Sequence, residues 1–84
     1  MSDVLYIEVT IDNKYYYIND IDKINNIIRI IRYWPLKSFS NHILDGEEYR
    51  IKIMTNNETT EYIGQGKYPK GYITFKNLIG DNYD

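Results

Sequence analysis

Hydrophobic and polar residues alternate along residues 4–11, a pattern that predicts a half-buried β-strand. One side of this segment carries Leu5, Ile7, Val9 and Ile11, and the other carries Tyr6, Glu8 and Thr10. Asp12-Asn13 is a two-residue turn signal, so residues 14–18 are expected to return antiparallel to the first strand. The chain is therefore predicted to begin with a β-hairpin.

A second pattern, with the period of an amphipathic helix, begins near residue 20. Isoleucines recur at helical spacing, at Ile21, Ile24, Ile27, Ile28 and Ile31. Asn19 or Asp20 can cap the N-terminus of this helix, and Pro35 disfavours helical backbone at Trp34, so the helix is expected to end near Tyr33. Because isoleucine is only a moderate helix former, packing against a sheet must supply much of the stability.

Residues 36–66 predict three more strands. Asp45-Gly46 is a strong hairpin signal, so part of residues 39–44 is expected to form a strand that turns into residues 47–55. Asn56-Asn57 marks the next turn, and residues 58–63 are expected to complete a three-stranded meander, which Gly64-Gln65-Gly66 ends.

The last segment predicts a helix that starts near Pro69 and is capped by Gly80. Its apolar stripe would consist of Tyr72, Phe75, Leu78 and Ile79. Gly71 and the pair Thr74-Phe75 leave a terminal strand as an alternative. Residues 1–84 are thus expected to form a single α+β domain of order β-β-α-β-β-β-α. Its small antiparallel sheet of about five strands would carry one or two helices packed on one face.

Composition then restricts the chemistry. The 84 residues include fifteen isoleucines, ten tyrosines, one histidine and no cysteine, and the net charge is −2. The lack of cysteine excludes disulfides, zinc–thiolate sites and thiol catalysis, and the charge disfavours attraction to nucleic acid or to an anionic membrane. No signal peptide or membrane span is recognisable, so a cytoplasmic protein is expected. The abundance of residues with AT-rich codons suggests an AT-rich bacterial genome or its phages and mobile elements.

No catalytic, cofactor or metal site is predicted. Ser40, His42 and Asp45 have the side chains of a catalytic triad, but their spacing on a strand and a turn does not orient them as one. His42 is the only nitrogen ligand. The acidic pairs lack a calcium-loop pattern and are interpreted as a helix cap (Asp20/Asp22), a turn (Glu47/Glu48) and a tail (Asp81/Asp84). Gly64-Gln65-Gly66-Lys67 lacks P-loop spacing and is interpreted as a bend.

The tyrosines are the best candidates for a binding surface. Because Tyr15, Tyr16 and Tyr17 are consecutive, at least one must point away from the core face, and Tyr6 is on the outward set of its strand. Trp34, Leu36 and Phe39 form a second cluster, equally compatible with core packing. The predicted partner-binding residues are Tyr6, Tyr15, Tyr16, Tyr17, Trp34, Phe39, Arg50, Lys52 and Tyr62.

These observations predict a small non-enzymatic, protein-binding inhibitor from a phage or mobile element, of the anti-CRISPR or anti-defence type, which occludes a host protein. One alternative is an immunity protein or antitoxin that neutralises a toxin. Another is a sheet that stacks its tyrosines on single-stranded nucleic acid, with Arg50 and Lys52 beside them. Exposed sheet edges also leave a homodimer open.

Overall fold

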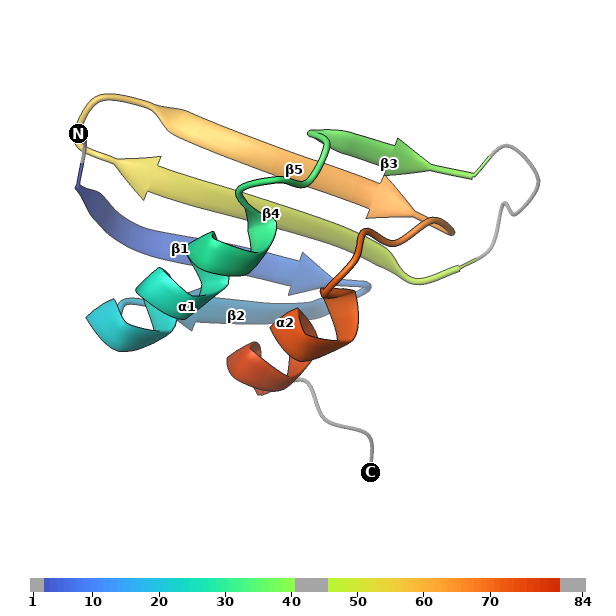
Figure 1. The fold of residues 1–84 in the computed structure, drawn as a ribbon, viewed down its shortest axis with the longest axis horizontal. Coiled ribbons are helices and arrows are strands. Elements are labelled where there is room, and N and C mark those ends of the chain that lie inside the picture. Colours follow the sequence, from blue (N-terminus) through green and yellow to red (C-terminus); the bar gives the residue numbers. More distant parts are fainter. Residues whose placement is uncertain (1–2, 41–45, 81–84) are drawn as a thin grey trace.

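The computed structural model describes residues 3–40 and 46–80 and, within them, shows a five-stranded sheet with two helices on one face (Figure 1). The strands are β1 (Val4–Ile11), β2 (Lys14–Ile18), β3 (Lys37–Phe39), β4 (Glu48–Thr55) and β5 (Thr59–Gln65). The helices are α1 (Ile21–Ile31) and α2 (Tyr72–Ile79). The element order confirms the predicted α+β fold, and α2 decides the last segment in favour of a helix.

The strand order across the sheet is β2-β1-β4-β5-β3. The pairs β2–β1, β1–β4 and β4–β5 are antiparallel, whereas β3 lies parallel to β5. The sheet is therefore mixed, and the predicted meander is wrong. Since β1 and β5 occupy the two edges of β4, β3 has no place beside β4 and adds to the outer edge of β5 instead. Strand β3 also lies earlier in the sequence than the predicted strand within residues 39–44. Residues 41–44 of that predicted strand fall outside the described residues.

The face of the sheet that the helices cover forms the core. Its fully buried or nearly buried residues on the two central strands are Ile7, Val9, Ile11, Tyr49, Ile51 and Ile53. Leu5 was expected among them but is 54% exposed. The cause is local: the register of β1 against β4 shifts between Val4 and Tyr6, which leaves Leu5 as an extra residue at a bulge.

Helix α1 starts where the sequence predicted. The Asp20 carboxylate accepts a hydrogen bond from the backbone N–H of Asp22, at 3.0 Å, which confirms Asp20 as a helix cap. The helix ends at Ile31 with Arg32 as its C-cap, a turn earlier than Pro35. Buried positions of the stripe are Ile24, Ile27 and Ile31, whereas Ile21 at the first helical position is exposed.

Helix α2 closes the core and adds a buried ion pair. Trp34 lies against Phe75 with ring centroids 5.5 Å apart, and Gly80 ends the helix in the left-handed conformation, at φ 89°. Lys76 is only 3% exposed, and its Nζ lies 3.0 Å from Oε1 of Glu47. Glu47 was interpreted as a turn residue, but its carboxylate also accepts a hydrogen bond from the Tyr72 hydroxyl and thus links the start of β4 to α2.

Candidate functional site

The face of the sheet opposite the helices, hereafter the open face, gathers most of the predicted binding residues. In an antiparallel pair, residues directly opposite each other share a face. Glu8 lies opposite Tyr17 on one side and Lys52 on the other, and Thr10 lies opposite Tyr15 and Arg50 in the same way. The open face is therefore formed by Tyr6, Glu8, Thr10, Tyr15, Tyr17, Arg50, Lys52, Met54, Thr59, Glu61 and Ile63. No helix of the described residues covers it (Figure 1).

Three tyrosines dominate one side of the open face. The rings of Tyr6 and Tyr17 pack at a centroid distance of 5.1 Å, and Tyr15 and Tyr17 are 58% and 53% exposed. The Tyr15 hydroxyl donates a hydrogen bond to Oε2 of Glu8, at 2.5 Å. This bond raises the pKa of Tyr15 from 10.0 to about 12, so its hydroxyl stays neutral at physiological pH. The rings offer a broad aromatic surface with one end held by a carboxylate.

Positive and negative side chains alternate beside these rings. Nε of Arg50 lies 3.6 Å from Oε2 of Glu61, and Lys52 lies opposite both Glu8 and Glu61. A shallow hollow of about 180 Å³ is lined by Glu8, Thr10, Tyr15, Arg50 and Lys52. The open face is thus aromatic and close to balanced in charge.

Other predicted binding residues lie elsewhere. Tyr62 is directly opposite Ile51 and therefore lies on the buried face, so its placement on the binding surface is wrong. Trp34 is 7% exposed and belongs to the core, as the core alternative for that cluster predicted. Tyr16 is half-buried on the helix side, and Phe39 is exposed on the edge strand β3.

Of the residues weighed for catalysis, only Ser40 lies within the described residues. His42 and Asp45 lie outside them, and the backbone N–H of Ser40 donates to the carbonyl of Gln65. Gly64 belongs to β5 and lies against the Tyr49 ring. A Cβ at this position would lie only 2.5 Å from Cε2 of Tyr49, too close for any side chain. That glycine therefore serves close packing. Among residues 3–40 and 46–80, no group of three His, Asp or Glu side chains could hold a metal ion.

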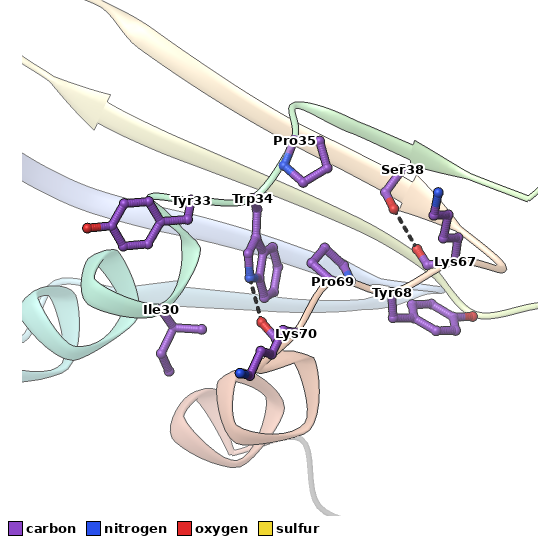
Figure 2. Close-up of a pocket in the computed structure, with 9 residues that line it drawn as sticks. All are labelled: Ile30, Tyr33, Trp34, Pro35, Ser38, Lys67, Tyr68, Pro69 and Lys70. Atoms are coloured by element: carbon purple, nitrogen blue, oxygen red, sulfur yellow. Dashed lines mark hydrogen bonds between the residues drawn. The ribbon is translucent and has the colours of Figure 1, made fainter.

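Sequence reasoning missed a pocket on the helix side, hereafter the loop pocket (Figure 2). Its volume is about 400 Å³, and it lies between the end of α1 and the segment that joins β5 to α2. It is lined by Ile30, Tyr33, Trp34, Pro35, Ser38, Lys67, Tyr68, Pro69 and Lys70. The two aromatic–proline pairs in the sequence, Trp34-Pro35 and Tyr68-Pro69, were the available signal. Only the fold shows that these two segments meet.

No helix in the described part of the chain is long and apolar enough to cross a membrane. Comparison with protein-family models, with curated proteins and with solved structures finds no match to this chain.

Proposed function

We propose that this protein is a small non-enzymatic inhibitor that uses its open face to cover a surface of another protein. The open face carries the proposal: Tyr6, Tyr15 and Tyr17 lie together beside Arg50 and Lys52, with no helix above them among the described residues. Tyrosine and arginine are enriched at the energetic centres of protein interfaces. Tyrosine also supplies a large contact area at a low cost in conformational entropy.

The charges of the open face favour a protein partner over nucleic acid. Glu8 and Glu61 lie directly beside Lys52, and Glu61 also neighbours Arg50, so the cations already have anionic neighbours. A nucleic-acid backbone would meet these carboxylates and be repelled, whereas a protein surface can match both signs. This balance of charges, together with the abundance of residues that have AT-rich codons, favours a cytoplasmic phage or mobile-element inhibitor of a host defence protein. Homodimerisation through the edge strands β2 and β3 stays a prediction.

The test is capture of a partner from the native host by the tagged full chain, followed by affinity measurement with variants. Tyr17→Ala combined with Arg50→Ala should weaken binding at least about tenfold, which corresponds to about 1.4 kcal/mol. Both side chains are exposed, so this variant should fold normally.

The matched control is Ile73→Ala combined with Arg29→Ala, which removes a large exposed apolar side chain and an arginine from the helix side, outside the lining of the loop pocket. The affinity of the control for the partner should lie within about twofold of that of the wild type, a much smaller change than the tenfold loss expected of the open-face variant. An open-face variant that binds the partner as tightly as the wild type would refute the proposal. A salt-sensitive mobility shift of single-stranded DNA that this variant abolishes would instead support the nucleic-acid alternative.

A further inference from the structure

The loop pocket lies on the opposite side of the molecule from the open face and plays no part in the proposed function. We propose that it binds an apolar side chain of a partner polypeptide whose neighbouring residues are acidic. The interior of the pocket, the charge at its rim and the rigidity of its walls each support this occupant.

The interior is suited to an apolar group. Its walls include the rings of Trp34, Pro35 and Pro69 and the side chain of Ile30. Two side-chain donors of the walls are already used within the walls: Nε1 of Trp34 donates to the carbonyl of Lys70 at 2.9 Å, and Oγ of Ser38 donates to the carbonyl of Lys67 at 2.9 Å (Figure 2). Neither donor is free to bond to an occupant. A polar occupant would therefore give up hydrogen bonds to water without receiving new ones from Trp34 or Ser38. The volume of about 400 Å³ accommodates a large aliphatic or aromatic side chain.

The rim is positively charged. Lys67 and Lys70 are both exposed, and no carboxylate within residues 3–40 and 46–80 forms an ion pair with either of them. The nearby Glu47 is already paired with the buried Lys76. Two ammonium groups without an ion-pair partner among the described residues, beside an apolar pocket, attract carboxylates and repel cations. A cationic occupant of the aromatic walls, such as a methylated lysine, is disfavoured for the same reason.

The walls are held in place before any ligand binds. The Tyr68 ring stacks on the Tyr72 ring at a centroid distance of 4.7 Å, and the Tyr68 hydroxyl donates to the carbonyl of Glu47 at 2.9 Å. The two hydrogen bonds to the carbonyls of Lys67 and Lys70 fix the same segment from its other side. The pocket itself would therefore lose little conformational entropy on binding, which favours measurable binding of a short peptide segment.

Trp34 is the only tryptophan of the chain, so its fluorescence reports on this pocket directly. The probe is the peptide acetyl-Asp-Glu-Phe-Glu-Asp-amide, titrated against the full chain to millimolar concentration. We expect a saturable change in Trp34 emission that weakens when the ionic strength rises from about 20 to about 200 mM, because salt screens the rim charges. A peptide with Asn and Gln in place of the acids should bind at least about tenfold more weakly. A peptide with Gly in place of Phe should show no saturation.

Charge-reversal variants locate the site. Lys67→Glu with Lys70→Glu should weaken binding of the acidic peptide at least about tenfold. Lys23→Glu with Lys37→Glu makes the same change in net charge at other exposed lysines and should bind within about twofold of the wild type. Circular dichroism establishes that both variants are folded. The open-face variant, Tyr17→Ala with Arg50→Ala, should bind the peptide normally, which separates this test from that of the proposed function.

Three results would overturn the inference. The first is the lack of any saturable response of Trp34 to the acidic peptide. The second is equal affinity for the peptides with and without carboxylates. The third is unchanged affinity in the folded variant Lys67→Glu with Lys70→Glu.

Discussion

Replacing Gly64 by alanine tests how closely β5 packs against its surroundings. An ideal Cβ at Gly64 would lie 2.5 Å from Cε2 and 2.6 Å from Cζ of Tyr49, and 2.6 Å from the carbonyl oxygen of Ser38. Tyr49 is fully buried, and the Ser38 carbonyl belongs to the backbone of β3, the strand paired with β5. Neither group can move aside without disturbing the core or the edge of the sheet.

The expected cost follows from these contacts. Overpacking of a core costs about 1–3 kcal/mol, and the upper half of that range applies because one contact is with backbone. Alanine would recover about 0.5–1 kcal/mol, since it restricts the unfolded chain more than glycine does. The net loss is therefore about 2 kcal/mol, and in a domain of this size each kcal/mol lowers Tm by about 4–8 °C. The variant should melt roughly 8–16 °C below the wild type.

The assay is thermal and urea unfolding followed by circular dichroism and Trp34 fluorescence. Gly80→Ala is the matched control, because a Cβ there meets nothing within 4 Å and only the positive φ of 89° opposes it. That strain costs about 1–2 kcal/mol at most, so the control should lose less stability than Gly64→Ala. A Tm of Gly64→Ala at or above that of the wild type would refute the steric reasoning.

Three further predictions concern the polar groups. Tyr49→Phe should leave the free energy of unfolding in urea unchanged or raise it by up to about 1–3 kcal/mol, because the buried Tyr49 hydroxyl has no hydrogen-bond partner among the described residues; a clear loss would contradict this. Glu47→Gln should cost about 2–3 kcal/mol and Lys76→Met less, because only the former removes negative charge from beside a buried ammonium group; equal losses in urea would count against the pair. The hydrogen bond to Glu8 raises the pKa of Tyr15 from 10.0 to about 12, so its contribution to stability is present below pH 10.0 and is lost as the pH rises to about 12. Tyr15→Phe should remove both this loss and the component near pH 12 from the tyrosine absorbance titration.

Tyr49 also illustrates the cost of close packing in this core. Burial raises the pKa of its hydroxyl, and the nearby Ser38 side chain offsets the rise only in part. Ser38 Oγ donates to the carbonyl of Lys67, and the Tyr49 hydroxyl has no hydrogen-bond partner among the described residues. The same tyrosine requires a glycine at position 64. The Tyr49 ring thus accounts for Gly64, the first glycine of the Gly64-Gln65-Gly66 segment.

Local signals in the sequence determined the first hairpin and the two helices. The first hairpin depends on alternation and on Asp12, which adopts the left-handed conformation at φ 54° that its turn requires. Helix α1 depends on its isoleucine spacing and the Asp20 cap, and α2 on its stripe and Gly80. The outward direction of Tyr15 and Tyr17 follows from the same local rule, because side chains alternate along a strand.

Only the tertiary structure decided which segments, distant in the sequence, lie next to each other. The edge position of β3 and the inward direction of Tyr62 depend on which strand edges other segments already occupy. The Glu47–Lys76 pair joins residues 29 positions apart, and the loop pocket joins residues 30–38 to residues 67–70. Periodicity and turn signals act over a few residues, whereas these contacts arise when separate elements compete for the same core. The sequence alone therefore predicts an aromatic open face, and the pocket behind it emerges only from the fold.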